Sequence, residues 1–274
     1  MKYKAKYSGL VIMMLFVLAI GATITAQAQG NPRLRLVHAS PDAPAADVYV
    51  DNDLFFQNIP FTNVTAYRTL TAGEHRIRIF VAGTPPQGQA VIDATFSFGG
   101  NQDYTMVAMG QVGGIALQLF PDDNRTPNAG QAKIRIIQAS PNLQPVNVCL
   151  VELNQCVTND LAFKNASGYT AVSTGSYNVQ LRPPGTNEVL FTSNFGFEDR
   201  FVYTLFIMGL WQAEPGLRII SGVDATPPPV LPPVTGALLS PTALLIVVVA
   251  VVSLIIVFVG GIWAWRHSRI KPNR

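Results

Sequence analysis

The sequence reads "VHASPDAPAADVYVD" at residues 37–51 and "IQASPNLQPVNVCLV" at residues 137–151. In both places a run of alternating apolar residues stops at Ser-Pro, and small or polar residues precede the next apolar run. Proline fixes its own φ, has no amide donor and biases the residue before it away from helix, so a strand entering this phrase must leave its sheet. The phrase therefore predicts two strands joined by a turn, once in each of two repeats.

The similarity extends well beyond this phrase. Residues 33–126 and 133–226 align with small shifts, and "YTMVAMG" at 104–110 matches "YTLFIMG" at 203–209. Each unit has about ninety-five residues, an ordinary size for a domain. The long period indicates tandem domains, since the units of a solenoid are shorter and depend on their neighbours.

Apolar side chains alternate within both units, as in "HRIRIFV" at 75–81 and "YNVQL" at 177–181, and Gly and Pro separate the runs. A period of two is typical of strands with one face on a core. We therefore predict an all-β protein with two tandem Ig-like or transthyretin-like β-sandwich domains, at 29–130 and 131–226, and one C-terminal transmembrane α-helix. A single sheet or a barrel is the alternative for each domain.

The N-terminal segment, residues 1–28, has the features of an export signal. Three lysines precede an apolar run that is short for a membrane span, and small residues allow cleavage after Ala28. An uncleaved N-terminal anchor is the alternative. The mature protein is expected to begin at Gln29.

The C-terminal segment has the pattern of a membrane anchor. A Pro-rich stalk is predicted at 227–240, a transmembrane helix at 241–265, and a basic tail at 266–274. The positive-inside rule places this tail in the cytoplasm and both β-domains outside the cell, as a single-pass protein of the cell membrane. A buried helix of a soluble protein is the alternative.

The net charge argues against nucleic acid as a partner. Residues 29–240 carry twelve Lys and Arg against sixteen Asp and Glu, which is a net charge of −4. The basic residues that remain belong to the two terminal segments. An acidic exported part lacks the positive surface that binds phosphate backbones.

His38, Ser40 and Asp42 are the residues in the first phrase that suggest catalysis. Their types match the base, nucleophile and orienting carboxylate of a hydrolase. The aligned residues of the second copy include Gln138 and Asn142, which supply neither base nor carboxylate, and Ser40 has no Gly-x-Ser-x-Gly context. We expect a turn and no catalytic residue, with one active copy beside a degenerate one as the alternative.

Two acidic stretches, 51–53 and 122–124, contain oxygen ligands but lack the Gly and Glu of a calcium loop. The histidines and cysteines have no zinc-site spacing. We expect no metal and no cofactor, and surface turns at both stretches.

Four arginines alternate along two of the predicted strands. If these strands pair, they form a basic stripe able to bind an anionic glycan. A solvated face is the interpretation that we favour. The four residues are Arg33, Arg35, Arg76 and Arg78.

Cys149 and Cys156 flank a short turn, and alignment places Tyr49 and Leu54 opposite them in the first copy. We predict a hairpin in each domain, closed in the second by a disulfide between neighbouring strands. Export favours oxidation. Two free thiols are the alternative.

The phrases "VHASPDAPAADVYVD", "LTAGEHRIRI" at 70–79 and "YTMVAMG" resemble a bacterial family, domain of unknown function 4397. The resemblance covers residues 33–226, and the second copy departs at Gln138, Asn142 and the cysteines. It implies a secreted or surface-held β-rich module, often in tandem behind a signal peptide. It brings no established active site, so no functional residue is carried over.

The ending "LPPVTG" at 231–236 resembles a sortase signal with one residue too many, which leaves attachment to the cell wall as an alternative to a retained helix. We expect a surface protein that binds, adheres or displays structure without catalysing a reaction. The expected ligand is an extracellular glycan or protein. A surface hydrolase that uses His38 and Ser40 is the alternative function.

Overall fold

The computed structural model describes residues 30–229. This part of the chain is all-β, as predicted, and its one helical element is η1, a 3₁₀ turn at Val151–Leu153. Contacts between Cα atoms divide the chain into two units between Pro227 and Pro228. Both sequence repeats belong to the first unit.

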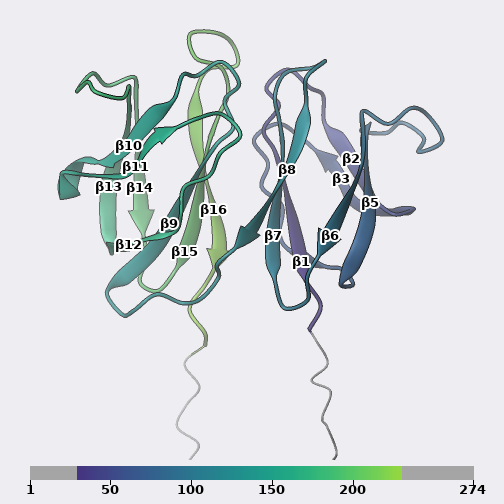
Figure 1. Cartoon of the computed structure of the whole chain (residues 1–274), viewed down its shortest axis with the longest axis horizontal. Coiled ribbons are helices and arrows are strands. Elements are labelled where there is room, and N and C mark those ends of the chain that lie inside the picture. The colour runs from purple at the N-terminus through teal and green to yellow at the C-terminus, as the bar shows by residue number, and fades with distance from the viewer. Residues whose placement is uncertain (1–29, 230–274) are drawn as a thin grey trace, which may run out of the picture. The chain divides into compact units, whose positions relative to one another are not determined.

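The first repeat folds as two four-stranded sheets, in the orders β4-β1-β7-β8 and β3-β2-β5-β6 (Figure 1). Neighbouring strands are antiparallel except β1 and β7, which are parallel. The strands are β1 (Arg33–His38), β2 (Ala46–Val50), β3 (Asp53–Ile59), β4 (Arg68–Thr69), β5 (Gly73–Val81), β6 (Ile92–Phe98), β7 (Asp103–Met109) and β8 (Ala116–Asp122).

The second repeat has the same topology, with sheet orders β12-β9-β15-β16 and β11-β10-β13-β14. Here β9 and β15 are the parallel pair. The strands are β9 (Gln131–Gln138), β10 (Val146–Leu150), β11 (Gln155–Leu161), β12 (Thr170–Ser173), β13 (Gly175–Arg182), β14 (Phe191–Phe197), β15 (Val202–Met208) and β16 (Arg218–Ala225).

Each repeat is a sandwich because its two sheets share one core. In the first repeat Leu34 and Leu36 on β1 pack with Ile77 and Ile79 from the opposite sheet. The strand order corrects one part of the prediction: in an immunoglobulin constant domain the first two strands share a sheet, whereas here β1 and β2 lie in different sheets.

The central strands of these two sheets, β1 with β7 and β9 with β15, are buried on both faces, a feature that the sequence pattern of β1 and β9 does not predict. Side chains on their outer faces form a third apolar cluster that draws equally on the two repeats and joins them into one unit. Its fully buried members are Val37, Ala39, Val107 and Met109 from the first repeat, and Ile137, Ala139, Phe206 and Met208 from the second.

The predicted export and anchoring segments lie outside the described residues. This holds for the cleavage site at Ala28, the stalk beyond residue 229, the helix at 241–265 and the tail at 266–274. Within residues 30–229 no helix has the length and hydropathy that a bilayer crossing requires.

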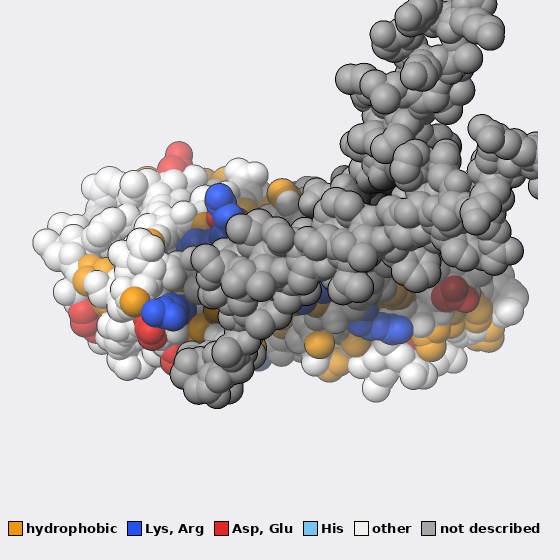
Figure 2. Space-filling model, turned by 90° about the horizontal axis from the view of Figure 1, so that it is seen from below, with side chains coloured by type: hydrophobic (Ala, Val, Ile, Leu, Met, Phe, Trp, Pro, Cys, Tyr) orange, Lys and Arg blue, Asp and Glu red, His pale blue; other side chains and the backbone are white. Residues whose placement is uncertain are grey.

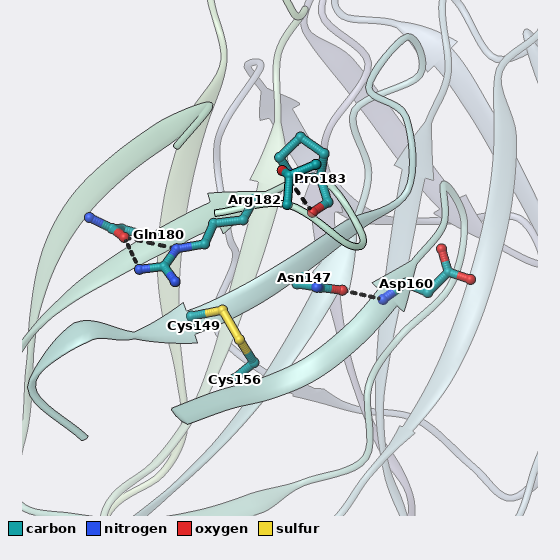
Figure 3. The surroundings of a disulfide bond; sticks show 8 residues. Asn147, Cys149, Cys156, Asp160, Gln180, Arg182 and Pro183 are labelled. Atoms are coloured by element: carbon teal, nitrogen blue, oxygen red, sulfur yellow. Dashed lines mark hydrogen bonds between the residues drawn. A yellow bond between two sulfur atoms is a disulfide. The ribbon is translucent and has the colours of Figure 1, made fainter. Parts of the chain in front are cut away.

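The predicted disulfide is confirmed. Cys149 on β10 and Cys156 on β11 are directly paired across the hairpin and bonded through their sulfurs (Figure 3). In the first repeat Tyr49 and Leu54 occupy the same cross-strand position, as the alignment predicted. The disulfide therefore closes one of two equivalent hairpins.

Replacing both cysteines by alanine is expected to lower the free energy of unfolding by about 2–3 kcal/mol, because the closed loop of roughly seven residues no longer restricts the unfolded chain. Denaturant unfolding of the wild type and of Cys149→Ala/Cys156→Ala measures this. The same midpoint for both proteins would contradict the expectation.

Candidate ligand-binding site

The opening phrase of the first repeat forms the end of the sandwich where β1 leaves its sheet. His38, the last residue of β1, is 3% exposed, and its Nε2 lies 3.0 Å from the carbonyl oxygen of Pro44. A carbonyl oxygen can only accept, so Nε2 carries the proton and Nδ1 is an acceptor in the neutral ring. Burial lowers the pKa of His38, against the opposing effect of the Pro44 carbonyl, and favours this neutral form.

Asp42 and Asp47 accept hydrogen bonds from backbone amides, and neither of them is hydrogen-bonded to His38. Asp42 Oδ1 accepts a hydrogen bond of 2.9 Å from the amide of Val112, in the loop between β7 and β8. Asp47 accepts amide hydrogen bonds from Asn58 and Gly83. Among residues 30–229, His38 forms no hydrogen bond with a carboxylate, so the turn role predicted for the phrase fits its geometry.

A cavity of about 290 Å³ opens at this end of the first sandwich. His38 and Ser40 are its two polar lining side chains, and none of the lining residues carries a formal charge. The apolar wall comes from both sheets and from the turns between them. It consists of Leu36, Ala43, Pro44, Ala45, Ala46, Ile79, Phe80, Val81, Val91, Ile92, Ala108, Val112 and Ile115, with Gly113 beside them.

The mouth of the cavity is rimmed by exposed valines. Val112 is 60% exposed, Val91 52% and Val81 38%, and all three line the cavity. They are three of the eight large apolar residues that the described part of the chain leaves exposed. Exposed apolar side chains gathered at one opening are typical of a binding site.

Two polar atoms at the cavity are buried without a hydrogen-bond partner in the described structure. They are Nδ1 of His38 and Oγ of Ser40, on residues that are 3% and 1% exposed. A buried polar group without a partner is unfavourable, and such groups are uncommon in folded proteins. Because both atoms are fully buried, a molecule in the cavity does not reach them without a rearrangement of the turn.

In the second repeat the equivalent polar groups have hydrogen-bond partners. The amide of Ser140 donates to Oε1 of Gln138 at 2.6 Å, and Ser140 Oγ donates to the carbonyl oxygen of Gly209 at 2.7 Å. Asn142 pairs with the backbone of Trp211, as Asp42 pairs with that of Val112.

Larger side chains also fill this end of the second sandwich. Leu143 takes the place of Ala43, is 4% exposed and belongs to the core. Trp211 takes the place of Val112 and packs against the same core. A wider, more open hollow of about 490 Å³ remains at this end of the second repeat. It is lined by Phe191 and by residues of the β15–β16 loop that include Trp211, and by neither Gln138 nor Ser140.

A second group of buried polar residues joins the two repeats through crossed ion pairs. Arg35 of the first repeat donates from Nη2 to Asp224 Oδ1 of the second at 2.5 Å, and the side chains are 1% and 0% exposed. Arg135 of the second repeat donates to Asp122 Oδ1 of the first at 2.6 Å. The two pairs are equivalent under exchange of the repeats.

Tyrosine and threonine side chains complete this network in the same symmetrical way. Tyr67 donates to Asp122 and Tyr169 donates to Asp224, both at 2.6 Å. Burial, with the nearby carboxylates, raises the pKa of each tyrosine well above its usual value, so both hydroxyls remain protonated donors. Thr105 bridges Arg35 and Asp122.

The network corrects one expectation from the sequence and excludes one of its alternatives. Asp122 was expected in a surface turn, but it is buried between the repeats. The basic stripe does not form, because β1 pairs with β4 and β7 whereas Arg76 and Arg78 lie on β5 in the other sheet. On the described part of the face in Figure 2, basic side chains lie among acidic ones.

The acidic stretch at 51–53 forms an exposed turn whose first carboxylate binds the protein itself. Asp51 contacts His75 Nδ1 at 2.8 Å and accepts from the amide of Arg76. Within residues 30–229, no group of His, Cys, Asp and Glu has the arrangement of a metal site.

Fold and site together define a protein of two β-sandwich repeats, joined through a buried charged interface, with an apolar cavity at one end of the first repeat. The family model described as Domain of unknown function (DUF4397) matches residues 32–149 and 150–230, and the chain belongs to this family. The division between the two matches falls inside β10, whereas the structural repeats meet between β8 and β9.

The curated proteins contain no match to this chain. Among solved structures, it is similar to a streptococcal virulence factor studied for α-glucan binding, with 10% identity over 69% of this chain and 96% of the other, at a TM-score of 0.22. It is also similar to a leucine-rich repeat protein from Bacteroides thetaiotaomicron, with 11% identity over 67% of this chain and 27% of the other, at a TM-score of 0.18. At TM-scores this low, neither likeness bears on the fold or the ligand of this chain.

Proposed function

We propose that the chain is an exported, membrane-anchored binding protein. Its first sandwich binds a ligand, and its second sandwich stabilises the first. The proposal rests on a structural difference between the two repeats at the equivalent end of each sandwich. The first repeat has an apolar cavity with an exposed rim beside His38 and Ser40, whereas the second has the larger Leu143 and Trp211 in the places of Ala43 and Val112 and a more open hollow away from Gln138 and Ser140. A concave apolar site with a few polar groups is the usual form of a binding site.

Binding at the cavity is tested by filling it with the residue that the second repeat uses. The full chain and its Val112→Trp variant are screened against glycan, peptide and small-molecule arrays, which also cover the glycan and protein ligands expected from the sequence. Val151→Trp, at an exposed valine in η1, is the control. Ligands lost in Val112→Trp and kept in Val151→Trp support the proposal, and equal binding by all three proteins contradicts it.

The proposal places both sandwiches outside the cell, on a C-terminal anchor. Its support is the sequence pattern of the segments at 1–28 and 241–274. Surface biotinylation of intact cells, followed by extraction with detergent, is expected to recover a labelled full-length chain in the membrane fraction. A product linked to cell wall and ending at Thr235 would replace the anchor with sortase attachment, and an unlabelled chain would contradict surface exposure.

A hydrolase that uses His38 and Ser40 is the competing function. We expect no covalent labelling of the chain by a fluorophosphonate probe for activated serines, because Nε2 of His38 is engaged by Pro44 and Asp42 binds the amide of Val112. His38→Gln, which copies the second repeat, is the control. Labelling of the wild type that disappears in this variant would establish the hydrolase.

A further inference from the structure

The loop that joins β15 to β16 is longer and more polar than its counterpart in the first repeat. It has nine residues, 209–217, whereas the β7–β8 loop has six, 110–115. The additional residues include Gln212 and Glu214, both exposed, and they follow Trp211 where a glycine follows Val112 in the first repeat. Loops that present extra side chains on a rigid scaffold are common binding elements.

Hydrogen bonds hold this loop in one backbone conformation. The side chain of Asn142 accepts from the amide of Trp211 at 2.7 Å and donates to its carbonyl oxygen at 2.9 Å. The amide of Leu210 donates to the carbonyl oxygen of Pro215 at 2.9 Å, which closes the loop at its base. A loop that is already ordered loses little conformational entropy when a ligand binds.

Trp211 provides an aromatic surface at the hollow of about 490 Å³ beside this loop. The residue is partly buried against the core of the second repeat, and it also lines the hollow. Because its backbone amide and carbonyl are both bonded to Asn142, the exposed part of the residue belongs mainly to the indole ring. Phe191, at the start of β14, is a second aromatic residue of the lining.

Gln212 and Glu214 supply polar groups beside the aromatic residues. Both line the hollow, and both are exposed to solvent, so a ligand reaches them without a change in the loop. The amide of Gln212 is able to donate and to accept, and the carboxylate of Glu214 accepts. Glu214 is the one lining residue of this hollow with a formal charge, so the site offers no cation to an anionic ligand.

We propose that the β15–β16 loop of the second repeat binds an uncharged saccharide. The apolar C–H face of a pyranose ring lies against the indole of Trp211, and the hydroxyls at the edge of the ring bond with Gln212 and Glu214. Because the hollow is open, a sugar unit occupies it while the remainder of a glycan chain stays in solvent. This site is separate from the cavity of the first repeat and goes beyond the proposed function.

The position of the loop leaves it accessible to a large glycan. It lies at one end of β16, and Ala225, after which the chain leaves the second repeat, lies at the other. Eight residues of strand separate the two ends by roughly 25 Å. In Figure 1 the loop projects beyond the sheets of the second repeat.

Two neutral trisaccharides, maltotriose and cellotriose, and the uronate forms of both test the site and its ligand class. Calorimetric titrations use the full chain in lipid nanodiscs, with empty nanodiscs as the baseline. We expect at least one neutral trisaccharide to bind, and its uronate form to bind at least about fivefold more weakly, because like charges repel at Glu214. Glu214→Gln is expected to reduce this difference.

Variants of the loop identify where the trisaccharide binds. Trp211→Val, which copies the first repeat, is expected to weaken binding at least about tenfold, whereas Trp211→Phe keeps an aromatic face and loses less. Gln212→Ala is expected to weaken binding about fivefold, the ratio that one net hydrogen bond gives. Ala43→Leu, which fills the cavity of the first repeat, is the control and is expected to change nothing.

Several results would overturn the proposal. If neither neutral trisaccharide binds, or if Trp211→Val binds as tightly as the wild type, the site is wrong. Loss of binding in Ala43→Leu would assign the probes to the first repeat. A uronate that binds as tightly as its neutral parent would refute the ligand class. If Trp211→Val does not fold, the double variant Gln212→Ala/Glu214→Ala, which alters two exposed side chains, replaces it with the same expected loss.

Discussion

Replacing Arg35 by alanine is expected to lower the free energy of unfolding of the two-repeat unit by about 3–5 kcal/mol. Arg35 is 1% exposed, and its loss leaves the carboxylate of Asp224 buried without its closest cation. Removing one partner of a buried ion pair has an effect of this size because the remaining charge stays uncompensated. Equilibrium unfolding in denaturant, followed by tryptophan fluorescence and circular dichroism, measures the change.

Arg33 provides the matched control, since it lies on the same face of the same strand and pairs with Asp103 at 2.5 Å. Its side chain is 50% exposed, so Arg33→Ala is expected to change the free energy of unfolding by less than about 1 kcal/mol. Arg35→Met combined with Asp224→Leu is expected to recover only part of the loss, because it removes both charges but leaves the hydroxyls of Tyr169 and Thr204 without the acceptor that Asp224 provides. A loss for Arg35→Ala no larger than that for Arg33→Ala would rule out the buried network.

Phe206→Ala is expected to lower the free energy of unfolding by about 3–5 kcal/mol through a different mechanism. Phe206 is fully buried in the apolar cluster between the repeats, and its ring lies 5.8 Å from the guanidinium carbon of Arg35. Truncation removes buried apolar area and leaves a cavity that neither sandwich fills alone. Phe206→Leu keeps more of the volume and is expected to lose about 1 kcal/mol. An alanine variant as stable as the leucine variant would contradict close packing between the repeats.

Much of the fold follows from local sequence patterns. Alternation of apolar residues identified the strands, proline identified the turn after β1, and the repeat identified two similar units. The hairpin pairing of Cys149 with Cys156 also followed, because the repeat supplied Tyr49 and Leu54 as an internal comparison. These features depend on residues that are close together in the sequence.

The interface between the repeats was missed because it depends on residues about 190 positions apart. Arg35 alternates with leucines, as a solvent-facing residue does, and its partner Asp224 is remote in the sequence. One local signal was present. The continuous apolar runs Met106–Met109 and Leu205–Met208 are typical of strands buried on both faces, and both runs pack on the neighbouring repeat as well as on their own core.

The sequence identifies two residues of the site, but it does not predict that they line a cavity. The sequence drew attention to His38 and Ser40, but it gave no indication of a cavity, because the volume depends on Ala43 and Val112 being smaller than their counterparts Leu143 and Trp211. Comparison of the two repeats position by position would have revealed the size difference. It would not have revealed that the polar atoms of the first repeat lack partners.

The central claim is that the first repeat has an apolar cavity beside Ala43, at a place where Leu143 occupies the space in the second repeat. Xenon enters apolar cavities of sufficient size and is readily located by crystallography. A crystal structure of the protein under xenon pressure is therefore expected to place xenon between Leu36, Ala43 and Val112, with none beside Leu143 in the second repeat. Xenon beside Leu143, or an empty cavity in the first repeat, would contradict the account.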